Sequence, residues 1–366
     1  MVKILQVVGK MNRAGMETLI MNIYRNIDKT KLQFDFCVHT SEEGDFDAEI
    51  KSLGGRIFHM PEATVQNFIK IGSAVEFFMR ENNQYAAVHV HYSCVGLYYF
   101  RAAKKYDIKY RIYHAHNSSR EKGMHAYLRY MMEQLSIKYA NILFACSDKA
   151  AKYNFKNINR KWHMLNNGID TDRFVYSLEK RNITRSKMHL ENKRVCIHVG
   201  RFDIQKNHEF LIEIFNRVFQ LDNTYVLLLL GSGPLKKKIQ EKVKHLPCCN
   251  NVYFLGNVDN VENMLNAADL FLLPSIYEGL PLSLVEAETS GIKCIISDTI
   301  TKEAVLVKEN VYQVSINDGT AWVEKILENQ IYSRVDKTSI IKEQGFDSKQ
   351  IAKKMQKYYL KLGTNV

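Results

Sequence analysis

The sequence contains no run of about 18 apolar residues, which is the length that a membrane-spanning helix requires. The apolar segment Val226–Leu230 has only the length of a buried strand. The run Ile4–Val8 near the N-terminus is too short for the apolar region of a secretory signal peptide, and it lacks the flanking residues of one. We therefore predict no membrane-spanning segment and expect a cytoplasmic protein.

The cysteines also lack any recognisable pattern. There are seven, an odd number, with no C-x-x-C pair and no two clusters at the spacing of a zinc site. This composition is typical of a reducing compartment and excludes a small disulfide scaffold. No His and carboxylate set has zinc spacing, so the sequence predicts no metal site and no metal cofactor.

Several common motifs of enzymes are absent. The glycines of the first loop do not fit the P-loop pattern, and Gly231-Ser232-Gly233 lacks the third glycine of a dinucleotide-binding fingerprint. Neither G-x-S-x-G nor H-E-x-x-H occurs. Two D-x-D triplets, at 45–47 and 170–172, can hold a divalent ion on a nucleotide diphosphate. Their positions, at a helix start and in a turn, favour a structural role.

The chain has 366 residues, 46% of them hydrophobic and 25% charged, which is typical of a globular protein of about two domains. Lys and Arg number 51 against 39 Asp and Glu, a net charge of +12. Residues 1–180 hold 26 of the basic and 18 of the acidic residues. An excess of this sign indicates anionic partners such as nucleotides, phosphates or an anionic membrane surface.

Short apolar strands alternate with amphipathic helices along the chain, which predicts an α/β fold with parallel, doubly wound sheets. The alternation stops over the polar residues 177–194 and then begins again, so a domain boundary is expected there. The predicted strands are 4–8, 34–39, 56–60, 87–91, 110–113, 141–145, 195–199, 225–230, 252–255, 270–274 and 293–297. A last helix is predicted over 347–362. Ligands of such sheets bind beyond the carboxyl ends of the strands.

The segment 277–286, Y-E-G-L-P-L-S-L-V-E, carries the strongest functional signal. It follows a predicted buried strand and begins a helix, so the amides of 279–282 would be free to bind a phosphate. Pro281 suits the first turn of that helix. The carboxylate of Glu286 could accept hydrogen bonds from both hydroxyls of a ribose. Glu278, near the start of the segment, is its other carboxylate.

Three further segments follow predicted strands. The first, 199–207, places the cations Arg201 and Lys206 where charge-assisted hydrogen bonds to phosphate can form. The second, 9–17, is a glycine-containing loop that leads into a helix. The third, 113–119, contains His114 and His116, either of which could bond a sugar hydroxyl. His89 and His91 alternate on another strand and are interpreted as structural.

Together these segments resemble the retaining glycosyltransferases of family 4, which have the GT-B architecture of two Rossmann-like domains facing across a central cleft. The resemblance covers nearly the whole chain. Glu278 and Glu286 match the E-x7-E motif, Arg201 and Lys206 match G-R-x4-K, and 167–170 match the N-G-[IV]-D turn. Gly15 matches the second glycine of the family's N-terminal loop, whereas Ala14 replaces the first. His116 matches the histidine beside the transferred sugar, with His114 as a competing match.

The resemblance implies an acceptor-side domain over 1–180, a donor domain over 181–345, and a C-terminal segment, 346–366, that packs back on the first domain. It implies transfer of a sugar from a nucleotide sugar, a UDP-sugar above all, to a hydroxyl with retention of configuration and without a metal. The implied catalytic residues are His116, Glu278, Arg201 and Lys206. The implied donor-binding residues are Gly15, Arg201, Lys206, Glu278, Gly279, Leu280, Pro281 and Glu286.

The implied acceptor is a glycan or a lipid-linked sugar, in the assembly of a capsule or another surface polysaccharide. The basic and tyrosine-rich stretch 101–129 fits peripheral contact with an anionic membrane, although an ordinary solvated surface explains it equally well. Two alternatives stay open: a GT-B protein that binds nucleotide sugars without catalysis, and a sugar-nucleotide epimerase. A nucleic-acid partner is suggested only by the charge, and no recognised motif supports it.

Overall fold

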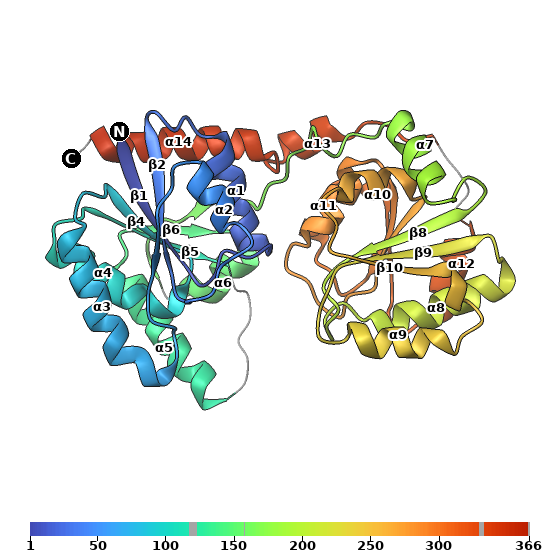
Figure 1. The fold of residues 1–366 in the computed structure, drawn as a ribbon, viewed down its shortest axis with the longest axis horizontal. Coiled ribbons are helices and arrows are strands. Elements are labelled where there is room, and N and C mark those ends of the chain that lie inside the picture. The colour runs from blue at the N-terminus through green and yellow to red at the C-terminus, as the bar shows by residue number, and fades with distance from the viewer. Residues whose placement is uncertain (117–122, 157, 329–332, 365–366) are drawn as a thin grey trace. The chain divides into compact units, whose positions relative to one another are not determined.

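The computed structural model describes residues 1–116, 123–156, 158–328 and 333–364, and the chain divides into two compact units (Figure 1). Unit 1 comprises Met1–Gly168 and Gly345–Val366, and unit 2 comprises Ile169–Gln344. The division falls before the boundary that the sequence predicted at 180. The reason is that residues 169–187 pack with the second unit.

Unit 1 contains a parallel seven-stranded sheet in the order β3-β2-β1-β4-β5-β6-β7. Its strands are β1 Val2–Val8, β2 Leu32–Val38, β3 Ile57–His59, β4 Ala87–Val90, β5 Tyr110–Ala115, β6 Ile142–Ala145 and β7 His163–Met164. Its helices are α1 Gly15–Asn26, α2 Asp47–Ser52, α3 Phe68–Glu81, α4 Gly96–Lys105, α5 Met124–Tyr139, α6 Asp148–Phe155 and α14 Ser348–Thr364, with short 3₁₀ helices at Val65–Asn67 and Ser93–Val95.

Both faces of this sheet are covered by helices, as apolar strands with parallel neighbours require. Leu5 and Val7 point into a core formed with α3 to α6, whereas Ile4 and Val8 point into a core formed with α1, α2 and α14. Helix α14, from the end of the chain, lies beside α1 and β1 (Figure 1). Gly168 is the point where the chain leaves the unit, and a side chain there would collide with Ile351 of α14.

Unit 2 contains a parallel six-stranded sheet in the order β10-β9-β8-β11-β12-β13. Its strands are β8 Arg194–Val199, β9 Tyr225–Leu230, β10 Val252–Gly256, β11 Leu270–Leu273, β12 Lys293–Ser297 and β13 Val311–Val314. Its helices are α7 Leu178–Lys187, α8 His208–Leu221, α9 Lys236–Lys244, α10 Val261–Ala267, α11 Leu282–Thr289, α12 Gly319–Glu328 and α13 Thr338–Glu343, with 3₁₀ helices at Cys249–Asn251, Lys302–Ala304 and Lys308–Asn310.

Helix α7 lies within the polar residues 177–194, where the sequence predicted a domain boundary and no helix. The side chain of Ser177 caps the helix, and Arg181 and Arg185 bond the backbone carbonyls of Ala268 and Ala267 at 2.8 Å each. Arg185 also pairs with Asp269 at 3.2 Å. These polar contacts attach a helix that has little apolar surface to unit 2.

Within the described ranges, none of the helices combines the length and the hydrophobicity that a bilayer-spanning segment needs. All seven cysteines are free thiols.

Candidate active site

In unit 2 the predicted cations lie in the loop that follows β8. Gly200 begins this loop, and its neighbour across the sheet edge is Gly231, where a Cβ would come within 2.1 Å of the Gly200 carbonyl oxygen. Gly231 has a φ of +134°, a backbone conformation that a glycine adopts without strain. The pair Gly231 and Gly233, which failed as a dinucleotide fingerprint, therefore lets the loops after β8 and β9 pack backbone against backbone.

Lys206 and Glu278 form an ion pair, with Nζ 2.5 Å from Oε1. Glu278 is buried, with 7% of its side-chain surface exposed, and its second oxygen accepts a hydrogen bond from the Gln205 amide at 3.0 Å. The loop after β8 and the loop after β11 are joined at the backbone as well, since the Ile276 amide donates to the Gln205 carbonyl at 2.8 Å. Two of the four predicted catalytic side chains are thus in direct contact.

Arg201 is exposed, and within the described part of the chain its side chain makes no hydrogen bond or ion pair. Arg201 and Lys206 both follow β8, so the guanidinium group and the ammonium group belong to the same loop. Because the guanidinium group of Arg201 has no partner there, all its N–H groups are available to an anion.

The N-terminus of helix α11 is built as the sequence predicted, except that Pro281 is the residue that precedes the helix rather than its first residue. No side chain caps this end. The amides of Gly279, Leu280, Leu282 and Ser283 have no backbone acceptor among the described residues. Unpaired amides at a helix start attract anions, because they carry the positive end of the helix dipole.

Glu286 lies one turn into α11 and is partly buried. Burial raises the pKa of this carboxyl to about 7, although the nearby Arg173 acts to lower it. Arg173 itself pairs with Glu262 at 2.7 Å. A carboxyl that titrates near neutral pH can change its hydrogen-bonding role within the physiological range.

In unit 1 the predicted residues Gly15 and His116 line one cavity of about 340 Å³. Gly15 is the exposed first residue of α1, and His116 directly follows β5. Ala14, which replaces a glycine of the family pattern, lines the same cavity. The carboxyl ends of β4 and β5 supply His91 and His114 to its wall.

Acidic side chains complete this cavity, and the sequence analysis did not single them out. Glu17 of α1 and Glu133 of α5 both line it, and burial raises the pKa of each carboxyl. Glu133 accepts a hydrogen bond from the Ser93 hydroxyl at 2.5 Å. Arg129 adds a cation to the wall. Such a lining offers several hydrogen-bonding groups to the hydroxyls of a sugar.

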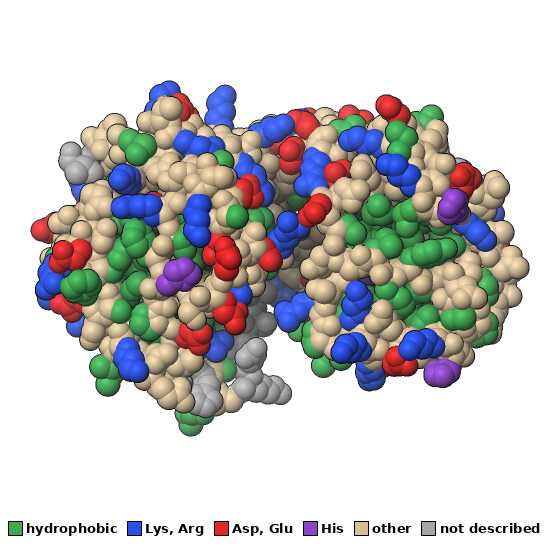
Figure 2. Space-filling model, viewed as in Figure 1, with side chains coloured by type: hydrophobic (Ala, Val, Ile, Leu, Met, Phe, Trp, Pro, Cys, Tyr) green, Lys and Arg blue, Asp and Glu red, His purple; other side chains and the backbone are tan. Residues whose placement is uncertain are grey.

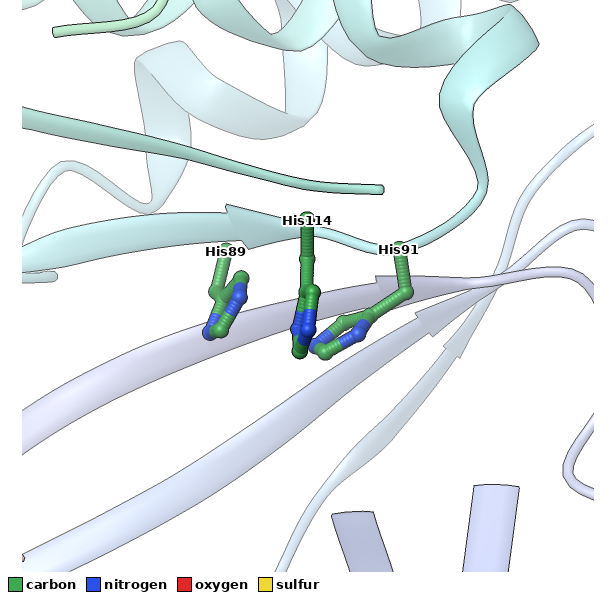
Figure 3. Close-up of side chains that lie close together, drawn as sticks. All are labelled: His89, His91 and His114. Atoms are coloured by element: carbon green, nitrogen blue, oxygen red, sulfur yellow. The ribbon is translucent and has the colours of Figure 1, made fainter. Parts of the chain in front are cut away.

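Four histidines meet at this edge of the sheet, and Figure 3 shows three of them, His89, His91 and His114, with their rings side by side. The structure brings them together because β4 and β5 are neighbours in the sheet. Burial lowers the pKa of all three imidazoles well below the usual value, so they are neutral at pH 7. His114 is fully buried, and neither of its ring nitrogens has a partner among the described residues.

Three neutral histidines are a possible ligand set for a metal ion, and their ligand atoms lie within 4.8 Å of one another. Two nitrogens on one tetrahedral zinc ion lie roughly 3.3 Å apart, given bond lengths of about 2.0–2.1 Å. All three nitrogens would have to lie near this separation to bind one zinc ion. Both nitrogens of His91 are also already hydrogen-bonded, to Gln6 and to His116.

The D-x-D triplet in unit 1 has a structural role, as the sequence suggested. Asp45 accepts a hydrogen bond from the Arg13 amide at 3.0 Å, and Asp47 accepts one from the Gly44 amide at 3.0 Å. In the second triplet, Asp172 pairs with Lys342 at 2.7 Å.

Comparison with known proteins agrees with this arrangement. Residues 179–356 match the family described as "Glycosyl transferases group 1", and residues 13–173 match "Glycosyltransferase Family 4". The chain is 33% identical over 360 residues to the "Putative glycosyltransferase EpsF" of Bacillus subtilis, with 95% of this chain and 94% of that protein covered. The chain belongs to the GT-B glycosyltransferases.

This glycosyltransferase is also similar to more distant proteins in sequence or in fold. It is 24% identical over 259 residues to the Escherichia coli "UDP-Gal:alpha-D-GlcNAc-diphosphoundecaprenol alpha-1,3-galactosyltransferase", with 68% of this chain and 67% of that enzyme covered. Among solved structures, Anabaena Alr3699/HepE in complex with UDP and glucose superposes with a TM-score of 0.78 and 16% identity, covering 98% of this chain and 99% of that one. The predicted α/β fold of two Rossmann-like domains is confirmed.

Proposed function

We propose that this glycosyltransferase moves a sugar from a UDP-sugar to a hydroxyl of a glycan or lipid-linked acceptor, with retention of configuration and without a metal ion. The observation that carries the proposal is the start of α11, where unpaired amides lie in the segment that also holds Glu278, itself paired with Lys206. In this proposal the unpaired amides and Lys206 bind the leaving diphosphate, and Glu278 binds the sugar.

The residues of unit 2 would act on the donor. Arg201, Lys206 and the unpaired amides at the start of α11, those of Gly279, Leu280, Leu282 and Ser283, would stabilise the negative charge that develops on the diphosphate as the glycosidic bond breaks. Glu278 would hold the donor sugar, and Glu286 the ribose hydroxyls. Gly279, Leu280 and Pro281 would give the diphosphate close access to the backbone.

Gly15 and His116 in unit 1 would contact the diphosphate and the transferred sugar. The acceptor hydroxyl would enter beside the departing phosphate, which gives retention without a covalent intermediate. The choice of UDP as the first nucleotide to test is supported by HepE, solved with UDP and with UDP-glucose, and by the E. coli relative that uses UDP-Gal.

The pathway proposed is the synthesis of a capsule or another surface polysaccharide. It is supported by similarity to "Capsular polysaccharide biosynthesis glycosyltransferase CapH" of Staphylococcus aureus, 22% identical over 375 residues. The proposal includes a cytoplasmic location and peripheral contact with an anionic bilayer, where lipid-linked acceptors reside.

Helix α5 supports the membrane contact. Met124, Leu128, Met131 and Leu135 are exposed along one face of it at helical spacing. Lys138 is exposed on the same helix, and Arg101 and Lys104 are exposed on α4, which packs against α5. An apolar helix face bordered by basic side chains is the pattern of a helix that binds an anionic membrane surface.

A nucleic-acid partner has less support. Figure 2 shows Lys and Arg side chains spread over the visible face of both units with Asp and Glu side chains between them. Nucleic-acid binding sites instead gather basic side chains in one stripe.

Thermal-shift titration with UDP, GDP, ADP and CMP in metal-free buffer tests the donor site. Wild type is compared with Glu286→Ala, and a ligand at a hundredfold excess over its dissociation constant stabilises by about 2.7 kcal/mol. A shift with UDP that Glu286→Ala abolishes supports the proposal. A shift without sugar transfer to any acceptor favours a non-catalytic binding protein, and interconversion of UDP-sugars without acceptor favours an epimerase.

A further inference from the structure

A chain of hydrogen bonds links His116 to the interior of unit 1. His116 Nε2 lies 3.0 Å from His91 Nδ1, and His91 Nε2 lies 3.0 Å from Gln6 Oε1. Gln6 is a buried polar side chain in the middle of β1, with 1% of its surface exposed. Buried polar groups of this kind are as a rule hydrogen-bonded to a partner.

Helix α14 borders this network through Tyr359, whose hydroxyl lies 2.6 Å from His89 Nδ1. The side chain of Gln6 lies close enough to Tyr359 to act on the pKa of its hydroxyl, which it lowers. Because Gln6 Oε1 faces His91, the amide N–H group of Gln6 is the one left to face the Tyr359 hydroxyl. Tyr359 is therefore the neighbour that favours this orientation of the amide.

This orientation determines where the protons of the histidines lie. A carbonyl oxygen only accepts, so His91 carries its proton on Nε2 and leaves Nδ1 unprotonated. His116 must then donate from Nε2 to His91 Nδ1. The remaining nitrogen of His116, Nδ1, is unprotonated and buried, and it has no partner among the described residues.

We propose that Gln6 and His91 are positioning residues that hold His116 in the Nε2–H tautomer, so that its Nδ1 accepts a hydrogen bond from a substrate hydroxyl. This inference rests on the proposed function, in which His116 contacts the transferred sugar. His116 lines the cavity of unit 1, and Tyr359 extends the same network to the last helix of the chain. A histidine fixed as an acceptor selects a hydroxyl and rejects a group that can only accept.

Burial keeps the network neutral, which a tautomer-based mechanism requires. It lowers the pKa of His116 to about 3 and that of His91 well below its usual value. The charged side chains that line the same cavity as the pair are Glu17, Arg129 and Glu133.

Long-range ¹H–¹⁵N NMR of histidine-labelled protein distinguishes the two tautomers of each ring and needs no substrate. The His116 resonances are identified by their loss in His116→Asn. In wild type we expect His116 protonated at Nε2. In Gln6→Leu we expect a mixture of tautomers, with kcat at least tenfold lower and the KM for UDP-sugar nearly unchanged. Gln6→Glu keeps an acceptor oxygen and should restore the Nε2–H tautomer.

Gln33→Leu is the matched control, because Gln33 is a buried glutamine on the adjacent strand β2 that bonds Tyr24 instead. It should leave both the tautomer and kcat unchanged. If Gln6→Leu does not fold, Tyr359→Phe tests the same network by removing only the hydroxyl that orients the amide. A wild-type His116 protonated at Nδ1, or an unaltered tautomer in both Gln6→Leu and Tyr359→Phe, overturns the inference. A wild type that transfers no sugar yet shows the expected tautomer overturns the proposed function instead.

Discussion

The ammonium group of Lys206 lies 2.5 Å from the buried carboxylate of Glu278. The two residues follow the neighbouring strands β8 and β11, so the sheet itself sets their separation. Each neutralises the other in the absence of substrate. Under the proposed function, the diphosphate of a bound donor would share the cation and the hydroxyls of its sugar would share the carboxylate.

We expect Lys206→Ala to lower kcat by about 10²- to 10³-fold, the usual loss when one donor to a developing anion is removed. The variant also leaves Glu278 buried without its cation, which should weaken donor binding. Steady-state kinetics with UDP-sugar measures both effects. Lys238→Ala is the matched control, since Lys238 pairs with Glu209 at 2.7 Å on the surface of the same unit. Equal activity of the two variants would contradict the role of Lys206.

The affinity for UDP-sugar should rise with pH because of Glu286. Its carboxyl has a pKa of about 7 in the free protein, and only the ionised form accepts hydrogen bonds from both ribose hydroxyls. Between pH 6 and pH 8 the ionised fraction rises about tenfold, so the dissociation constant should fall by about that factor. Calorimetry with UDP-glucose, which does not itself titrate in this range, measures it. Glu286→Gln should show no such slope, and a slope of the opposite sign would refute the assignment.

Removal of metal should leave activity unchanged. The proposed site neutralises the diphosphate with Arg201, Lys206 and the amides of α11, so extensive dialysis against EDTA is expected to preserve kcat. The histidines His89, His91 and His114 should bind Zn²⁺ weakly, because both ring nitrogens of His91 are already engaged in hydrogen bonds to Gln6 and His116. Calorimetry with Zn²⁺ checks this. Loss of activity that Mg²⁺ or Mn²⁺ restores would disprove the metal-independent mechanism.

Binding to anionic vesicles should depend on helix α5. Leu128 and Met131 are 41% and 43% exposed. Burial of a fully exposed side chain of this kind contributes about 1.5–3 kcal/mol, so burial of the exposed two-fifths contributes roughly 0.6–1.2 kcal/mol for each residue. Leu128→Glu combined with Met131→Glu should reduce co-sedimentation with vesicles of anionic lipid at least tenfold. Leu221→Glu, at a position on α8 that is 68% exposed, is the control. Equal binding of both proteins would locate the membrane contact elsewhere.

The sequence was sufficient to predict that the proposed donor-binding residues follow strands of one sheet, because their signals are local. Arg201, Lys206, Glu278 and Pro281 all lie in short segments that directly follow a strand, and parallel sheets place such segments at one edge. Most strands of both sheets were predictable for a similar reason, since runs such as Tyr225–Leu230 are buried on both faces. The edge strands β7 and β13 were not predicted, because β7 has two residues and β13 is only partly buried.

The network behind His116 could not be predicted in this way. His89 and Tyr359 are 270 positions apart in the sequence, and Gln6, His91 and His116 come from three separate strands or their ends. Each of these residues taken alone fits an ordinary structural role. Helix α7 was missed for a different reason, because hydrogen bonds of Arg181 and Arg185 attach it to unit 2 and a hydrophobic pattern does not reveal such contacts.

Glu288 gives a prediction about stability rather than activity. It lies on α11, fully buried, and its Oε1 accepts hydrogen bonds from the amides of Leu306 and Val307 at 2.8 and 2.7 Å. Glu288→Ala removes the only acceptor that the described residues provide for these amides. Buried unpaired donors cost about 1–3 kcal/mol each, so we expect a loss of about 2–6 kcal/mol in the free energy of unfolding for the two amides. Glu288→Gln keeps the acceptor oxygen and should lose much less.

The same residue should make stability depend on pH. Burial raises the pKa of Glu288 to about 8 in the folded protein, whereas in the unfolded chain it stays near 4.5. Between these values the folded state binds a proton that the unfolded state does not, so the free energy of unfolding falls as the pH rises from 4.5 to 8. The slope is at most about 1.4 kcal/mol per pH unit. Urea denaturation at several pH values should show this slope in wild type relative to Glu288→Gln, and a difference between the two that does not vary with pH would show that Glu288 is ionised in the fold.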